Sequence, residues 1–137
     1  MMVDMPTVKA EENTVLLVMD HGDEDVKLIT SLLQKSGFHV VRSANKTEVL
    51  DLCRTGDDAI QLMIADTGTP GIQISDLLEQ VQAVNPHVRV LVISGKKELE
   101  PVKKSGNVRA YLSRPFRRAQ FLGSVLDAAK GPLVRTA

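Results

Sequence analysis

Short apolar runs alternate with segments of helical period along most of the chain. The apolar runs, rich in β-branched residues, are residues 15–19, 40–41, 62–65 and 88–93, with a weaker run at 110–112. Continuous apolar runs are typical of strands buried on both faces of a parallel sheet, so we expect inner strands at these places.

Four segments between and after these runs repeat apolar residues at spacings of three and four, which predicts amphipathic helices. Gly37 and Gly56 are expected to end the first two helices, and Ser75 to cap the third. The segment from Gly95 to Val108 contains Pro101, so a short or distorted helix is expected there. The positions expected to be buried are Val26, Ile29, Leu32 and Leu33; Val49, Leu50 and Cys53; Leu77, Leu78, Val81 and Val84; and Phe121, Leu122, Val125, Leu126 and Ala129.

Five strands alternating with helices predict one α/β domain, a doubly wound parallel sheet with helices on both faces. We expect the folded domain over residues 14–131. Residues 1–13 show no apolar period and are expected to form a flexible arm, and residues 132–137 a short tail.

Composition excludes several classes of function. The 137 residues contain 17 Lys and Arg against 17 Asp and Glu, so no field of one sign favours nucleic acid or an anionic membrane. The single cysteine, Cys53, cannot form an intramolecular disulfide, and no apolar run of membrane-spanning length or signal-peptide pattern is present. We therefore expect a cytoplasmic protein.

Polar side chains follow four of the predicted strands. Asp20 follows the first, Asp66 the third, Ser94 ends the fourth and Arg114 follows the fifth. Parallel strands end at the same edge of a sheet, so these groups are expected to converge at a site. Two carboxylates at one edge favour a hard cation such as Mg²⁺ between them. With Arg114, Ser94 and the turn amides near Thr67 and Gly68, such a site would hold a phosphoryl group, for which an Asp can be the nucleophile.

These residues, in this order and spacing, resemble the receiver domain of two-component response regulators. The features that carry the resemblance, from about Thr14 to Lys130, are Asp20, Asp66 with Pro70-Gly71 four residues later, Ser94, Tyr111 and Arg114-Pro115-Phe116. It implies a chemotaxis-type, flavodoxin-like fold with strand order 2-1-3-4-5.

The resemblance also implies a function. Asp66 would accept a phosphoryl group from a histidine kinase or phosphotransfer protein. The domain would not be an enzyme, except that it would catalyse at most its own phosphorylation and dephosphorylation. Asp20, Asp66 and the Gly68 carbonyl would hold Mg²⁺. Ser94 would follow the phosphoryl group and Tyr111 would change rotamer. A downstream protein would then bind the face made by the last strand and its two flanking helices. The chain itself would be a monomer or a weak homodimer.

Two positions depart from the family pattern. In an ungapped reading His21 stands at the second of two positions that are usually acidic, and Asp23 could replace the missing carboxylate; a one-residue gap would instead place Met19 and Asp20 at the acidic pair. Arg114 stands where the family has a lysine, and delivers its charge as a planar fork instead of a compact ammonium.

Three other functions compete with phosphoryl acceptance. A pseudo-receiver, binding proteins without phosphorylation, is favoured by His21 and Arg114. A flavin carrier on this fold is disfavoured because the loop after the first strand is acidic, with Asp20, Asp23, Glu24 and Asp25. A haloacid-dehalogenase-like phosphatase would need an Asp where Gly22 stands. Only residues 131–137 follow the last helix, so we expect either output through another protein or a chain that is a fragment of a larger one.

Overall fold

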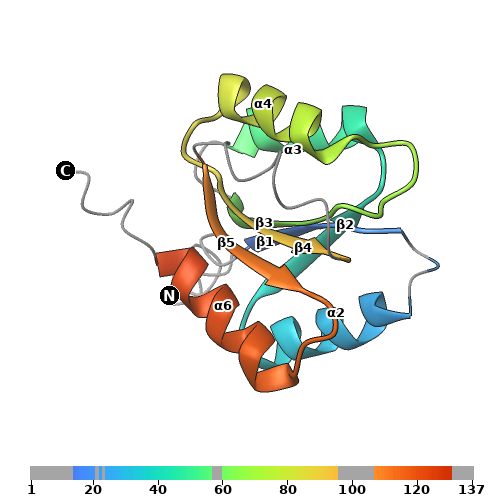
Figure 1. The fold of residues 1–137 in the computed structure, drawn as a ribbon. Coiled ribbons are helices and arrows are strands. Elements are labelled where there is room, and N and C mark those ends of the chain that lie inside the picture. The colour runs from blue at the N-terminus through green and yellow to red at the C-terminus, as the bar shows by residue number, and fades with distance from the viewer. Residues whose placement is uncertain (1–13, 21, 23, 57–59, 96–106, 131–137) are drawn as a thin grey trace, which may run out of the picture.

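The chain forms a five-stranded parallel sheet between two layers of helices (Figure 1). The computed structural model describes residues 14–20, 22, 24–56, 60–95 and 107–130. The strand order is β2-β1-β3-β4-β5, and all neighbouring pairs are parallel. The strands are β1 (Thr14–Val18), β2 (His39–Ser43), β3 (Ile60–Asp66), β4 (Arg89–Ser94) and β5 (Val108–Ser113). The α/β class and the strand order expected from the sequence are confirmed.

The helices cover both faces of the sheet, as predicted. Figure 1 shows α3 and α4 on one face, and α2 and α6 on the other. Their bounds are α2 (Asp25–Lys35), α3 (Lys46–Gly56), α4 (Ile74–Val84) and α6 (Arg118–Lys130). None of the described helices is long and apolar enough to span a bilayer. The short helix expected between β4 and β5 would fall on residues 96–106, outside the described residues, as would the expected arm and tail.

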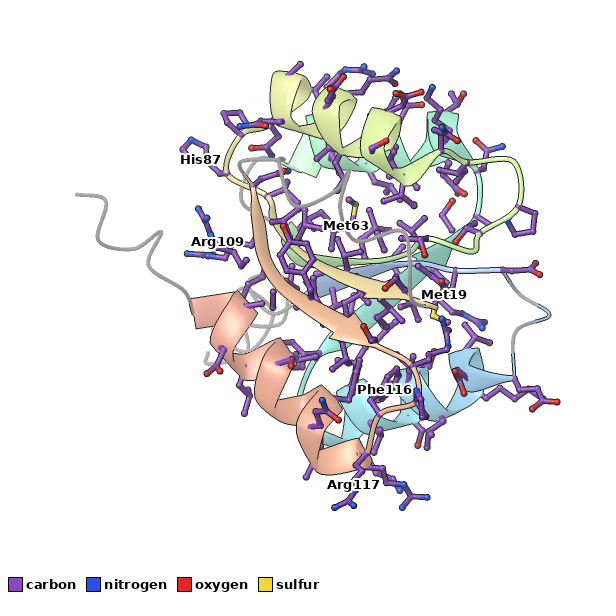
Figure 2. All side chains as sticks on the ribbon, in the orientation of Figure 1. Met19, Met63, His87, Arg109, Phe116 and Arg117 are labelled. Carbon is purple, nitrogen blue, oxygen red and sulfur yellow. The ribbon has the colours of Figure 1, made fainter. Side chains whose placement is uncertain are left out.

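The alternation of side chains along each inner strand divides the core into two halves. In β1, Leu16 and Val18 face α3 and α4. Val15, Leu17 and the residue that follows the strand, Met19, face α2 and α6. Figure 2 shows Met63 between the sheet and the α3–α4 layer. Each fully buried aliphatic side chain contributes roughly 1.5–3 kcal/mol. Burial on both faces is why the inner strands are continuous apolar runs.

Two of the expected inner strands are edge strands. Among the described strands β2 pairs with β1 alone, and accordingly His39 and Arg42 are exposed and Val40 and Val41 are half-buried. β5 forms the other edge, and most of its residues are half-buried. The prediction of inner strands at residues 40–41 and 110–112 was wrong because the order of strands leaves each of them one partner.

Some helix details also differ from the sequence predictions. Gly37 has φ of +96°, which confirms the left-handed cap after α2. Ser75, however, lies inside α4 and not at its N-cap. The helix begins at the buried Ile74, two residues before the start that a Ser75 cap implies, and Gln73 is the N-terminal flanking residue. Leu126 is 45% exposed, since the face of α6 that contacts the sheet is set by Phe121 and Val125.

Candidate functional site

The candidate site lies where β1, β3, β4 and β5 end, and Asp66 is at its centre. Asp66 is the last residue of β3 and only 3% exposed. Its neighbour in β4 is Ile93, whose carbonyl accepts a hydrogen bond of 2.9 Å from the Thr67 N–H. This places the Asp66 side chain at the edge of the sheet while its backbone remains in the ladder. The Thr67 amide, expected to cradle a phosphoryl group, is therefore engaged in the sheet.

Three N–H groups hold the Asp66 carboxylate. The Gly68 amide donates to Oδ1 at 2.9 Å, as in a turn closed by an Asx side chain. Arg114 Nη1 donates to Oδ1 at 3.3 Å, and Nη2 donates to Oδ2 at 3.0 Å. A buried carboxylate needs such partners, and the guanidinium fork matches its two oxygens. The structure therefore brings Asp66 and Arg114 together across the end of β4, as expected for groups at the same edge of a parallel sheet.

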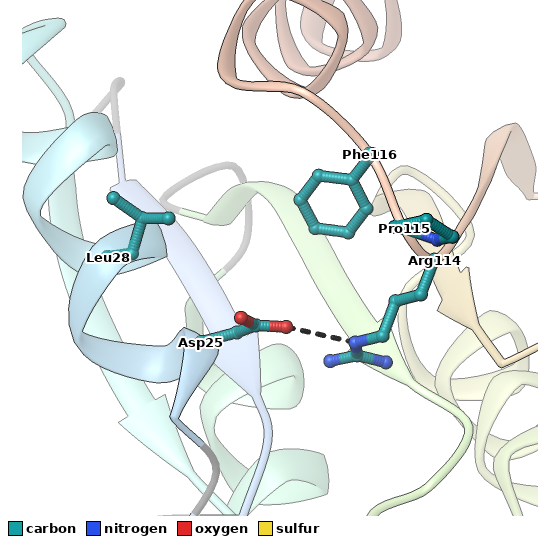
Figure 3. Close-up of a pocket in the computed structure, with 5 residues that line it drawn as sticks. All are labelled: Asp25, Leu28, Arg114, Pro115 and Phe116. Atoms are coloured by element: carbon teal, nitrogen blue, oxygen red, sulfur yellow. Dashed lines mark hydrogen bonds and ion pairs between the residues drawn. The ribbon is translucent and has the colours of Figure 1, made fainter.

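Arg114 is held by contacts beyond Asp66. Its backbone N–H donates to the Ser94 carbonyl at 3.0 Å, which continues the pairing of β4 with β5. Its Nε donates to Oδ2 of Asp25, in the first turn of α2, at 3.0 Å (Figure 3). The guanidinium thus bridges a nearly buried carboxylate and a half-buried one, and is itself 27% exposed.

Sequence reasoning assigned no role to Asp25 or Thr69. Asp25 was an acidic residue in the loop after the first strand, and nothing local indicated that it would meet Arg114, 89 residues away. The buried Thr69 hydroxyl is within 2.8 Å of the Asp66 carbonyl and 3.3 Å of the Val18 carbonyl. Thr69 therefore closes the turn after β3 and ties it to the end of β1.

Ser94 places a hydroxyl at the end of β4. It is fully buried, and its Oγ has no hydrogen-bond partner in the part of the chain that the structure describes. An unpaired buried hydroxyl is destabilising by roughly 1–3 kcal/mol, so a retained one often marks a functional position. Tyr111, in β5, is half-buried against the α3–α4 half of the core, and burial raises the pKa of its phenol. It does not take part in the hydrogen bonds around Asp66 described above.

Two of the three residues expected to bind a metal are exposed, whereas Asp66 is buried. Asp20 lies two residues beyond β1 and is exposed, and Gly68 is also exposed. In the described part of the chain, no three His, Cys, Asp or Glu side chains form a cluster suited to a metal ion. His21 and Asp23 lie outside the described residues. The donor set of Asp20, Asp66 and the Gly68 carbonyl consists of oxygen atoms only, and this chemistry fits Mg²⁺.

The family model of the response regulator receiver domain matches residues 15–126. The chain belongs to the response regulator receiver family. The receiver resembles the polar-differentiation response regulator DivK of Brucella anthropi, with 24% identity over 80% of this chain and 91% of DivK. It also resembles sporulation initiation phosphotransferase F of Bacillus subtilis, with 22% identity over 86% of this chain and 92% of that protein. Nodulation protein W of Bradyrhizobium diazoefficiens is 23% identical over 89% of the chain, which spans 54% of that longer protein.

Solved structures share the receiver fold. A CheY-like receiver domain protein from Methanospirillum hungatei superposes with a TM-score of 0.77, at 18% identity over 91% of this chain and 98% of that one. The receiver domain of a sensor histidine kinase from Pseudomonas aeruginosa gives a TM-score of 0.75, at 17% identity over 87% of this chain and 98% of that one. That structure is described with a magnesium ion coordinated in its active-site cleft.

Proposed function

We propose that this receiver accepts a phosphoryl group on Asp66 from a histidine kinase or phosphotransfer protein, in a Mg²⁺-dependent step in the cytoplasm, and signals by contact with another protein. The observation that carries the proposal is the contact of both Asp66 oxygens with the Arg114 fork, together with the buried Ser94 hydroxyl at the end of β4, which has no partner among the described residues. A guanidinium and a free hydroxyl are groups that bind phosphoryl oxygens well.

The two Asp66 oxygens have different surroundings. Oδ1 accepts from both Gly68 and Arg114, whereas among the described contacts Oδ2 accepts from Arg114 alone. Oδ2 is therefore the better nucleophile. It would form the new O–P bond as the P–N bond to a donor histidine breaks, and that histidine nitrogen would keep the electron pair and take a proton.

The remaining residues have separate tasks in this proposal. Arg114 would neutralise the phosphoryl oxygens, and the Ser94 hydroxyl would donate to one of them, which gives the unpaired Oγ a partner. Mg²⁺, held by Asp20, Asp66 and the Gly68 carbonyl, would supply the further positive charge that phosphoryl transfer to a carboxylate requires. A phosphoryl group adds about −1.5 to −2 charges, enough to reorganise the polar contacts around it.

Labelling by a small phosphodonor tests the proposal. The folded chain is incubated with acetyl phosphate, with and without Mg²⁺, and the intact mass is measured. We expect one added phosphoryl group on the native chain with Mg²⁺ and none on Asp66→Asn. Asp51→Asn is the matched control, because it makes the same charge change at an exposed carboxylate paired with Arg54. Label on Asp66→Asn, or none on the native chain, would overturn the proposal.

A pseudo-receiver is the second candidate, and one observation favours it. Arg114 already pairs with Asp66 and contacts both of its oxygens, so the carboxylate has a charged partner without metal or phosphoryl group. In that case the folded chain would take no label, and beryllofluoride with Mg²⁺ would leave the amide resonance of Gly68 unchanged.

A further inference from the structure

The Arg114 guanidinium is held from two sides by carboxylates on different elements. Nη1 and Nη2 donate to Asp66 at the end of β3, and Nε donates to Asp25 at the start of α2. A guanidinium is planar, so an acceptor on Nε together with acceptors on both η nitrogens fixes its orientation as well as its position. Asp25 therefore determines how Arg114 presents its fork to Asp66.

We propose that Asp25 is a positioning residue that holds Arg114 as a cap over Asp66, and that a cation must displace the cap to reach the carboxylate. The inference rests on the proposed function, because it assumes that Mg²⁺ binds Asp66. Its support is the increase in side-chain exposure along the triad of Asp66, Arg114 and Asp25. The Asp66 side chain is 4% exposed, that of Arg114 27% and that of Asp25 38%. The contact between Asp25 and Arg114 is thus the solvent-facing end, where the cap can open.

The backbone beneath Arg114 is anchored, so opening is a movement of the side chain. The Arg114 N–H is bonded to the Ser94 carbonyl, and two residues later the Phe116 ring stacks on Phe121 with centroids 5.8 Å apart. Phe121 is fully buried in the core beneath α6. The segment carrying Arg114 is therefore held on both sides.

Space for the displaced side chain exists beside the triad. A pocket of about 190 Å³ is lined by Asp25, Leu28, Arg114, Pro115 and Phe116. Figure 3 shows Phe116 and Leu28 across this pocket from one another, with the bond between Asp25 and Arg114 at its side. The methylene stem of Arg114 can lie on these apolar groups once its guanidinium has left Asp66 and Asp25.

Asp25 acts on a cation in two opposing ways. Its charge attracts Mg²⁺ to the site, whereas its hydrogen bond stabilises the cap that blocks Asp66. Asp25→Asn removes the charge but keeps an oxygen acceptor for Nε, and Asp25→Ala removes both. Comparison of these two variants isolates the hydrogen bond at constant charge.

Mg²⁺ titrations of both variants, followed by the Gly68 amide resonance, test the cap. One hydrogen bond of this kind contributes enough to weaken binding roughly three- to tenfold. We therefore expect Mg²⁺ to bind Asp25→Ala that much more tightly than Asp25→Asn. The exposed pair is the control, since Asp51→Asn and Asp51→Ala should bind Mg²⁺ equally. Equal affinities for the two Asp25 variants, or weaker binding by Asp25→Ala, would overturn the proposal.

A second readout does not depend on metal or phosphorylation. The Arg114 Nε–H should give a proton resonance protected from exchange with water in the native chain and in Asp25→Asn, and unprotected in Asp25→Ala. Protection that survives in Asp25→Ala refutes the cap even if no Mg²⁺ binds. Failed labelling by acetyl phosphate, with the expected Nε–H pattern intact, would refute the proposed function and leave the positioning role in place.

Discussion

The pairing of Arg114 with Asp66 is expected to contribute measurably to stability. Breaking a buried ion pair by removing one partner is destabilising by roughly 3–5 kcal/mol. Here Asp66 keeps the Gly68 N–H, and the Arg114 side chain is 27% exposed, so part of that penalty is relieved by water. We therefore expect a coupling energy of about 2 kcal/mol between the two side chains.

A double-mutant cycle measures this coupling. Urea unfolding of the native chain, Arg114→Met, Asp66→Asn and the double variant provides four free energies of unfolding. Arg114→Met should be the more destabilising single change, because it leaves a nearly buried carboxylate without its cation. Asp66→Asn leaves only a partly exposed arginine, which can turn toward solvent.

The exposed pair between Asp51 and Arg54 is the internal standard. Its two atoms are also close, at 2.9 Å, but the side chains are 62% and 54% exposed. A pair of this kind contributes roughly 0.3–0.5 kcal/mol. The reasoning would be refuted if the coupling energy of Arg114 and Asp66 were no larger than that of Asp51 and Arg54. It would also be refuted if Asp66→Asn were more destabilising than Arg114→Met. Either result would show that burial does not strengthen the pair.

Four further outcomes are expected. Ser94→Ala should leave the free energy of unfolding unchanged or raise it by up to about 1 kcal/mol, because the buried Oγ has no partner among the described residues. A loss of more than about 1 kcal/mol in urea unfolding would contradict this expectation. Burial raises the pKa of the Cys53 thiol to about 11, so the native chain should resist iodoacetamide at pH 8 and react only when unfolded. Because the unfolded thiol ionises near 9.0, stability should also fall between pH 9 and 11 in the native chain and less so in Cys53→Ala. Phe121→Ala should lose about 3–5 kcal/mol of stability because Phe121 is fully buried, whereas Leu126→Ala should lose less than about 1 kcal/mol because Leu126 is exposed. Losses of similar size for the two variants would show that α6 is packed differently.

Most of the fold could be predicted because its signals are local. Residues 15–19, 62–65 and 88–93 lie in or directly beside the three inner strands, since burial on both faces requires uninterrupted apolar residues. The meeting of Asp66 with Arg114 could also be expected, because parallel strands end at one edge. The roles in metal and phosphoryl binding stay predictions, for His21 and Asp23 as well as for the described residues.

Other features could not be predicted because they depend on distances through space. The contact of Asp25 with Arg114 joins residues 89 positions apart, and nothing in the loop around Asp25 distinguishes it from its acidic neighbours. The same limit applies to Leu126, whose apolar character suggested burial until the face of α6 that contacts the sheet was known.

By itself, the amino-acid sequence determined the alternation of strands and helices, the parallel sheet and the edge at which the polar groups gather. These follow from local periodicity and from the common direction of the strands. Only the tertiary structure decided that the Asp66 carboxylate is nearly buried beneath a guanidinium and that Asp25 orients this guanidinium. Burial and hydrogen-bond geometry depend on how α2, β3 and β5 are placed in three dimensions, and this placement results from packing across the whole core.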